Sequence, residues 1–141
     1  MGFFDIFKKK VEQKNSPIPG YEAIMETMSH FTKESLSDLP DDIFDNKENE
    51  MKAYMYFLGA LDAIAQCENI NMQDTISLLT MYLYREFKCS AEETGSLIVI
   101  LTDNSNNPQY SDCMQCGGKT LIDWYNKRCS ASRALSILLK T

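Results

Sequence analysis

Two cysteines, Cys113 and Cys116, stand three positions apart, a spacing at which two thiolates can share a zinc ion or exchange as a disulfide. Zinc needs two further ligands, and neither the other three cysteines nor the only histidine, His30, forms a second pair. A thioredoxin-like site would follow a strand, whereas a polar loop precedes this motif. We therefore interpret both cysteines as small residues on the packed side of a helix, and we expect neither a metal ion nor a cofactor.

A glycine pair follows this motif, and Gly117-Gly118-Lys119-Thr120 resembles the end of a phosphate-binding loop. The full loop motif has another glycine five positions before Gly118, where this chain has Cys113. No strand pattern leads into the segment either. We instead expect the two glycines to weaken or kink a helix and to let another helix approach closely.

No arrangement typical of an enzyme surrounds His30, so a Ser–His or Cys–His pair would have to assemble in three dimensions. Carboxylates are frequent between residues 38 and 50, but this polar stretch lacks the burial that adapts a carboxylate to general acid–base catalysis. Asp41, Asp45 and Glu48 also do not match a calcium-binding loop, which needs a central glycine. Loose cation binding is the metal alternative that this segment leaves open. We expect no enzymatic activity.

One short segment holds as much net charge as the whole chain, which carries −6 over 141 residues. Residues 34–50 contain seven acidic side chains and one lysine, whereas residues 1–14 carry a net +2. Excess acid disfavours nucleic-acid binding, which requires lysine and arginine to neutralise phosphate. It favours a basic protein partner, with an idle, solvated loop as the alternative. The carboxylates that we expect to contact the partner are Asp38, Asp41, Asp42, Asp45, Glu48 and Glu50.

Phenylalanines and lysines are spaced over residues 3–14 in a pattern typical of an amphipathic helix. Such a helix can lie on a membrane, with its lysines near anionic lipid, but we favour its packing onto the core. The prolines and glycine that follow separate an N-terminal helix and linker, residues 1–16, from a helical domain over 17–141. Neither a signal peptide nor an apolar stretch long enough to cross a bilayer is evident, so we expect a cytoplasmic protein with reduced thiols.

Apolar residues recur at helical spacing through the rest of the chain, without an alternating strand pattern or an internal repeat. Helices are expected near residues 21–36 and 50–68, the second of them central and mostly buried. Between them, Ile43 and Phe44 should pin the acidic segment, as a loop or short helix, to the body. Asn69 or Asn71 should cap the next helix, with Asp74 in its first turn, and the capping box Ser90–Glu93 should begin the one after it. Pro108 suits the first position of a helix that ends near Tyr125, and Ser130 should cap the last helix. The sequence predicts an all-α fold, a compact single-domain bundle of six or seven helices.

A local family resemblance covers residues 58–94. It is carried by Leu61-Asp62-Ala63-Ile64-Ala65, by the polar turn Glu68-Asn69-Ile70-Asn71 and by Phe87-Lys88-Cys89-Ser90-Ala91-Glu92-Glu93, and the opening Met1-Gly2-Phe3-Phe4-Asp5 adds to it. These residues resemble TerB-like domains, small all-helical bacterial modules linked to tellurite resistance and stress. The family's turn usually carries an Asp-Gly pair, whereas Glu68-Asn69 stands here. The resemblance therefore implies the helical fold, without an acidic metal site.

The aromatic side chains strengthen the argument for a binding surface, because a small bundle cannot bury all of them. Those considered are Tyr54, Tyr56, Tyr82, Tyr84 and Trp124. Together with the acidic segment they predict a non-enzymatic protein-binding protein. Its sharpest form is a bacterial immunity protein whose acidic face blocks a basic partner such as a nuclease toxin. The alternative is a TerB-like stress-response or membrane-associated helical module.

Overall fold

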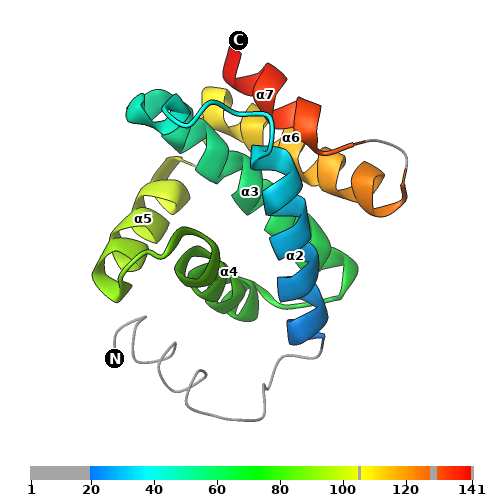
Figure 1. The fold of residues 1–141 in the computed structure, drawn as a ribbon. Helices are drawn as coiled ribbons and strands as arrows, with labels where there is room; N and C mark the ends of the chain where they lie inside the picture. Colours follow the sequence, from blue (N-terminus) through cyan, green and yellow to red (C-terminus); the bar gives the residue numbers. More distant parts are fainter. Residues whose placement is uncertain (1–19, 105, 128–129, 141) are drawn as a thin grey trace.

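The computed structural model describes residues 20–104, 106–127 and 130–140, and within them the fold is all-α (Figure 1). Six α-helices and one short 3-10 turn are present in this part of the chain, which confirms the predicted helical bundle. The elements are α2 (Tyr21–Leu36), η1 (Ile43–Asp45), α3 (Lys47–Cys67), α4 (Met72–Phe87), α5 (Ala91–Asn104), α6 (Pro108–Tyr125) and α7 (Ser132–Lys140). The helix predicted over residues 3–14, and the boundary near residue 16, lie outside the described residues.

The helix starts follow local capping chemistry. Helix α2 has the predicted bounds, whereas α3 begins at Lys47, three residues before the predicted start. The reason is Asn46, whose side-chain oxygen accepts hydrogen bonds from the backbone N–H of Glu48 at 2.9 Å and of Asn49 at 3.3 Å. The acidic residues that follow Asn46 therefore belong to the first turn of α3, where negative charge is favourable.

Helices α4 and α5 begin as predicted. The side chain of Asn71 accepts the N–H of Asp74 at 2.8 Å, which identifies Asn71 as the cap of α4. The capping box before α5 is reciprocal: the Ser90 hydroxyl accepts the N–H of Glu93 at 3.1 Å, and the Glu93 carboxylate accepts the N–H of Ser90 at 3.2 Å. The starts of both helices are thus specified by local sequence.

The last two helices combine local and distant caps. Pro108 occupies the first turn of α6, and the helix ends at Tyr125 as predicted. The Ser130 hydroxyl accepts the N–H of Ser132 at 3.3 Å, in keeping with its predicted capping role. A second cap comes from α2, where the Glu34 carboxylate accepts the N–H of Ala131 at 3.2 Å. Glu34, one of the seven acids of residues 34–50, therefore serves the fold rather than a partner.

Helix α3 lies at the centre of the bundle and packs against α2, η1, α4, α6 and α7. The prediction that this helix is central and mostly buried is confirmed, with Met55, Tyr56, Phe57, Ala60 and Leu61 almost fully buried. A cluster of aromatic rings joins it to its neighbours. A buried hydrogen bond of 2.5 Å between the hydroxyl groups of Thr32 and Tyr82 ties α2 to α4 beside this cluster.

Helices α3 and α6 share the most extensive packing surface in the described chain, and glycines make it close. A Cβ on Gly59 would meet the backbone of Met114, and a Cβ on Gly117 would meet the backbone of Tyr56, in both instances far inside van der Waals contact. The side chains of Glu48 and Gln109 meet near the two helix starts, so the helices run in the same direction. The predicted close helix approach is confirmed, and α6 continues without interruption through both glycines.

None of the helices in the described part of the chain combines the length and the apolar composition needed to cross a membrane. The longest, α3, carries charged residues in its first two turns and Asp62 in its second half.

Candidate acidic docking surface

The acidic segment predicted to bind a partner connects the end of α2 to the second turn of α3. Figure 1 shows it in cyan and teal, leaving α2 and turning back into α3. Asp38, Asp41, Asp42, Asp45 and Glu48 are exposed, and Glu50 is half-buried. Ile43 and Phe44 are half-buried against the core, which confirms that these two residues pin the segment to the body.

Consecutive turns shape the backbone of this segment. The N–H of Leu39 donates to the carbonyl of Leu36, that of Ile43 to Pro40 at 3.1 Å, and that of Asp45 to Asp42 at 3.0 Å. Of the loop or short helix predicted for this segment, the structure has turns and a single 3-10 turn, η1, which spans Ile43–Asp45. The aspartates are therefore displayed from a folded turn structure that two apolar side chains attach to the bundle.

Only one of the predicted site residues has its carboxylate engaged by the described chain. Glu48 accepts a hydrogen bond of 2.7 Å from the Gln109 amide and lies 3.8 Å from the Lys52 ammonium. By contrast, no described side chain forms an ion pair with the exposed aspartates, which are Asp38, Asp41, Asp42 and Asp45. Their negative charge is available to a partner.

The structure extends the acidic surface onto α5, which the sequence did not reveal. A groove of about 400 Å³ runs between the start of α3 and the first turns of α5. It brings Glu50 together with Glu92 and Glu93, which are more than 40 positions away in the chain. The two α5 glutamates were recognisable in the sequence only as helix-start residues, because nothing local indicates that α5 lies beside α3. The lining residues are Glu50, Tyr54, Cys89, Glu92, Glu93, Ser96, Leu97 and Ile100.

The protonation states in this groove make it a negative, unreactive surface. Hydrogen bonds from the Ser90 hydroxyl and the Ser90 N–H hold the pKa of the Glu93 carboxyl below its ordinary value, so Glu93 is charged at neutral pH. Burial raises the pKa of the Tyr54 phenol, and the neighbouring Cys89 and Glu50 raise it further. Burial and Glu93 likewise raise the pKa of the Cys89 thiol. The phenol and thiol are therefore neutral, and the thiol is a poor nucleophile.

Cys113 and Cys116 lie on the packed side of α6, as predicted. Cys113 is buried between α6, α3 and α5, and its thiol lies 3.4 Å from the carbonyl of Gln109 in its own helix. Cys116 is half-buried against the main core, and both thiols are free. No group of three metal-ligating side chains gathers anywhere in the described residues. Cys129 lies outside them.

Burial should make the cysteines differ in reactivity by a measurable amount. Burial raises the pKa of the Cys113 thiol, whereas Cys67 is exposed at the end of α3. With iodoacetamide at pH 7.5, Cys67 should be alkylated at least about 10-fold faster than Cys113, because the thiolate is the reacting species and must be accessible. Peptide mass spectrometry over a time course measures both rates. Equal rates in the native protein would contradict this prediction, and equal rates are expected in urea.

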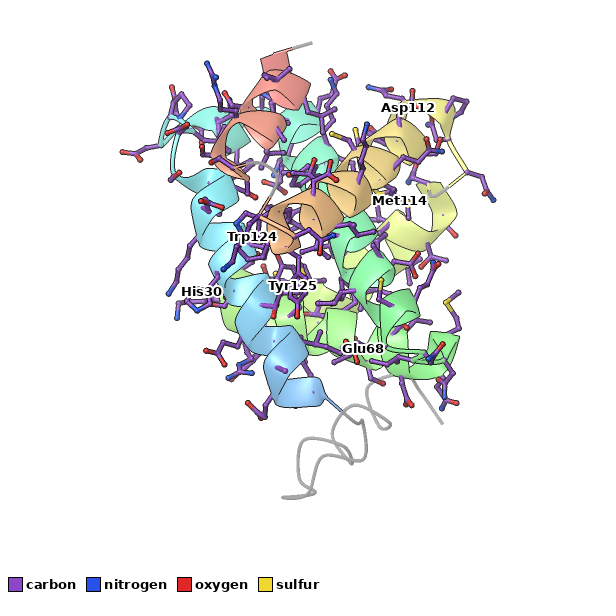
Figure 2. The ribbon with its side chains drawn as sticks, turned by 90° about the vertical axis from the view of Figure 1, so that its right-hand side faces the viewer. His30, Glu68, Asp112, Met114, Trp124 and Tyr125 are labelled. Atoms are coloured by element: carbon purple, nitrogen blue, oxygen red, sulfur yellow. The ribbon has the colours of Figure 1, made fainter. Side chains whose placement is uncertain are left out.

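His30 is exposed on α2. Its Nε2 lies 3.9 Å from the Glu26 carboxylate, and it makes no hydrogen bond to a described serine or cysteine. Figure 2 shows it next to Trp124 and Tyr125 from the end of α6, with which it borders a groove of about 530 Å³. The Ser–His or Cys–His pair considered from the sequence does not assemble among the described residues.

The aromatic side chains divide between the core and the surface. Tyr56 and Tyr82 are fully buried, so they are not available to a partner. Tyr84 is 59% exposed on α4, which confirms that the bundle does not bury every aromatic residue. Tyr54 alone among those considered lines the groove beside the acidic segment.

The candidate docking surface thus has two adjoining parts: the acidic segment with its exposed aspartates, and the groove between α3 and α5. Both parts include residues from the start of α3. Comparison of the whole chain with protein-family models, with curated proteins and with solved structures finds no match. The TerB-like resemblance of residues 58–94 stays a prediction.

Proposed function

We propose that this protein is a non-enzymatic, cytoplasmic binding protein, and specifically a bacterial immunity protein that covers the basic active site of a toxin such as a nuclease. The observation that carries the proposal is the display of Asp38, Asp41, Asp42 and Asp45, exposed and without ion-pair partners in the described chain. A segment that served only to connect two helices would not need to hold several like charges together, since they repel one another.

The physical basis is mimicry of a nucleic-acid backbone. A nuclease site is rich in lysine and arginine because it must bind phosphates. Carboxylates spaced along a folded turn offer the same negative charge, accelerate the encounter and block substrate entry once bound. A net charge of −6 for the whole chain supports the same long-range attraction.

The attachment of the acidic segment to the bundle also favours binding. Ile43 and Phe44 pack against the core, and the Asn49 side-chain amide donates to the carbonyl of Ile43 at 3.4 Å. The acidic segment is therefore fixed in two ways: the apolar side chains of η1 pack against the core, and a side chain from the start of α3 hydrogen-bonds its backbone. A segment that is already ordered loses less conformational entropy when it binds than a flexible one.

Neutralising the turn tests the proposal. In the triple variant Asp41→Asn, Asp42→Asn and Asp45→Asn, we expect affinity for the basic partner to fall by about 10-fold or more, mainly through slower association. The partner is isolated by affinity capture from cells that produce the chain naturally, then purified. Surface plasmon resonance at two salt concentrations gives the rate constants, and a nuclease assay shows whether the chain inhibits the partner.

The matched control removes three charges elsewhere: Glu22→Gln and Glu26→Gln in the first turns of α2, and Glu68→Gln after the end of α3. All three residues are exposed, and Figure 2 shows Glu68 at the opposite end of α3 from the acidic segment. This control should retain most of the affinity. If both triple variants bind and inhibit equally well, the acidic segment is not the contact surface and the proposal fails.

The alternative function is a TerB-like stress-response or membrane-associated module. It is favoured by the residues of 58–94 that resemble the family and by the lysines and phenylalanines of residues 3–14. Sedimentation of the full chain with anionic lipid vesicles, together with no inhibition of any captured basic protein, would favour this alternative over the immunity function.

A further inference from the structure

Helix α5 has more apolar surface than the core covers. It carries five consecutive apolar residues, Leu97 to Leu101, which circle the helix instead of occupying one face. The core takes up Ile98 and Leu101, which are buried. Val99 is 59% exposed and Ile100 is 42% exposed. Adjacent exposed apolar residues of this kind mark interaction sites.

The groove beside Ile100 adds negative charge to this apolar surface. Glu50 enters it from α3, and Glu92 and Glu93 enter it from α5. None of the described residues that line the groove is a lysine or an arginine, so the three carboxylates have no cationic partner there. Half-buried Tyr54 and Leu97 complete the lining. Negative charge beside apolar surface is complementary to a basic segment with apolar neighbours.

We propose that the groove between α3 and α5 anchors the basic partner by accepting one of its arginine side chains, flanked by apolar residues. This inference rests on the proposed function and names the chemistry of the partner's anchor. Arginine fits better than lysine, because its planar guanidinium hydrogen-bonds carboxylates on more than one edge and stacks against a tyrosine ring such as that of Tyr54. The flanking apolar residues cover Val99 and Ile100.

The two parts of the surface then act at different stages of binding. The exposed aspartates around η1 attract the partner over a distance and raise the association rate. The groove removes the partner's arginine and its apolar neighbours from water. Interactions of that kind lengthen the lifetime of a complex. Changes in the groove should therefore accelerate dissociation, whereas changes in the acidic segment slow association.

The first test uses defined peptides and the full-length, 15N-labelled chain. Acetyl-Leu-Arg-Leu-amide should shift the backbone amide signals of residues 92–100 in a saturable manner, with a dissociation constant in the millimolar range. Acetyl-Gly-Arg-Gly-amide and acetyl-Leu-Gln-Leu-amide should bind at least about 5-fold more weakly, because each lacks half of the recognised chemistry. Equal binding of the three peptides, or the absence of saturable shifts, would overturn the inference.

The second test uses variants. Glu92→Gln combined with Ile100→Ser should weaken peptide binding by about 10-fold and raise the dissociation rate of the purified partner by a similar factor. The matched control, Glu68→Gln with Ile137→Ser, changes the same residue types at exposed positions of α3 and α7 and should leave both unchanged. Both double variants involve exposed side chains, so the fold is retained in each.

Other occupants of the groove give distinct results, and each of them overturns the inference. If Ile100→Ser alone shifts the amide signals of residues 3–14, the groove belongs to that segment of the same chain. If it abolishes self-association in sedimentation velocity, the groove belongs to a second copy. If partner binding depends on Asp41, Asp42 and Asp45 but not on Glu92 and Ile100, the proposed function stands and the groove inference fails.

Discussion

Replacing Gly117 with alanine is expected to destabilise the protein by about 3 kcal/mol or more, although the change adds a single methyl group. The new Cβ would lie against the Tyr56 carbonyl oxygen and only 2.7 Å from the Tyr56 carbonyl carbon. These are backbone atoms of the central helix and cannot rotate away. Helices α3 and α6 would have to separate along the most extensive contact in the described bundle.

Gly118 provides the matched control one position away. A Cβ on Gly118 would lie 3.2 Å from the carbonyl oxygen of Gly59 and 3.4 Å from the Cβ of Ala63, which a small adjustment relieves. Alanine is favoured over glycine within a helix by about 1 kcal/mol. Gly118→Ala should therefore change stability by less than about 1 kcal/mol in either direction, since the two effects oppose each other. Urea unfolding followed by circular dichroism measures both variants, and equal stability of the two would contradict the predicted helix contact.

Phe31→Ala is expected to cost about 3–5 kcal/mol, a large part of the total stability of a domain of this size. Phe31 is fully buried and joins three helices through ring contacts. Its ring centroid lies 5.8 Å from that of Tyr56 in a stacked arrangement, 6.3 Å from that of Phe57 and 5.3 Å from that of Trp124. Truncation would remove these contacts and leave a cavity where α2, α3 and α6 meet.

The same unfolding experiment shows whether the loss of stability comes from the burial of the removed ring or from the removal of any aromatic side chain. Tyr84→Ala removes a ring that is 59% exposed on α4, so it should change stability by no more than about 0.5 kcal/mol. Trp124 fluorescence reports on the Phe31 site directly, because the two rings are in contact. An unfolding midpoint for Phe31→Ala close to that of the unchanged protein would show that α2 does not dock as described.

Much of the fold was predictable because apolar spacing and helix caps each depend on residues that are close together in the sequence. Apolar spacing placed α2 at its observed bounds, and the capping box at Ser90 and Glu93 is formed as expected. The start of α3 was wrong by three residues because the cap, Asn46, lies within the acidic segment and was not recognised as a helix signal. Helix capping depends on a few neighbouring residues, so it can be recognised in a single sequence.

The candidate site was only half predictable. The acidic segment is contiguous in sequence, so its charge could be located by inspection, and its exposure followed from its polarity. Glu92 and Glu93 could not be assigned to the same surface, because their proximity to Glu50 depends on where the bundle places α5 relative to α3. The burial of Tyr56 and Tyr82, in contrast to exposed Tyr84, was equally inaccessible.

The helices, most of their ends and the position of the charge could therefore be derived from the sequence, because each depends on residues within a few turns of one another. Which helices meet depends on the tertiary fold. Gly117 and Gly59 lie on different helices, and their shared role emerges when two backbones come into contact. The groove likewise exists only because the fold places the first turns of α5 near the start of α3, bringing together carboxylates that the chain keeps far apart. Contacts between distant segments are selected by the packing of the whole core, which no local pattern encodes.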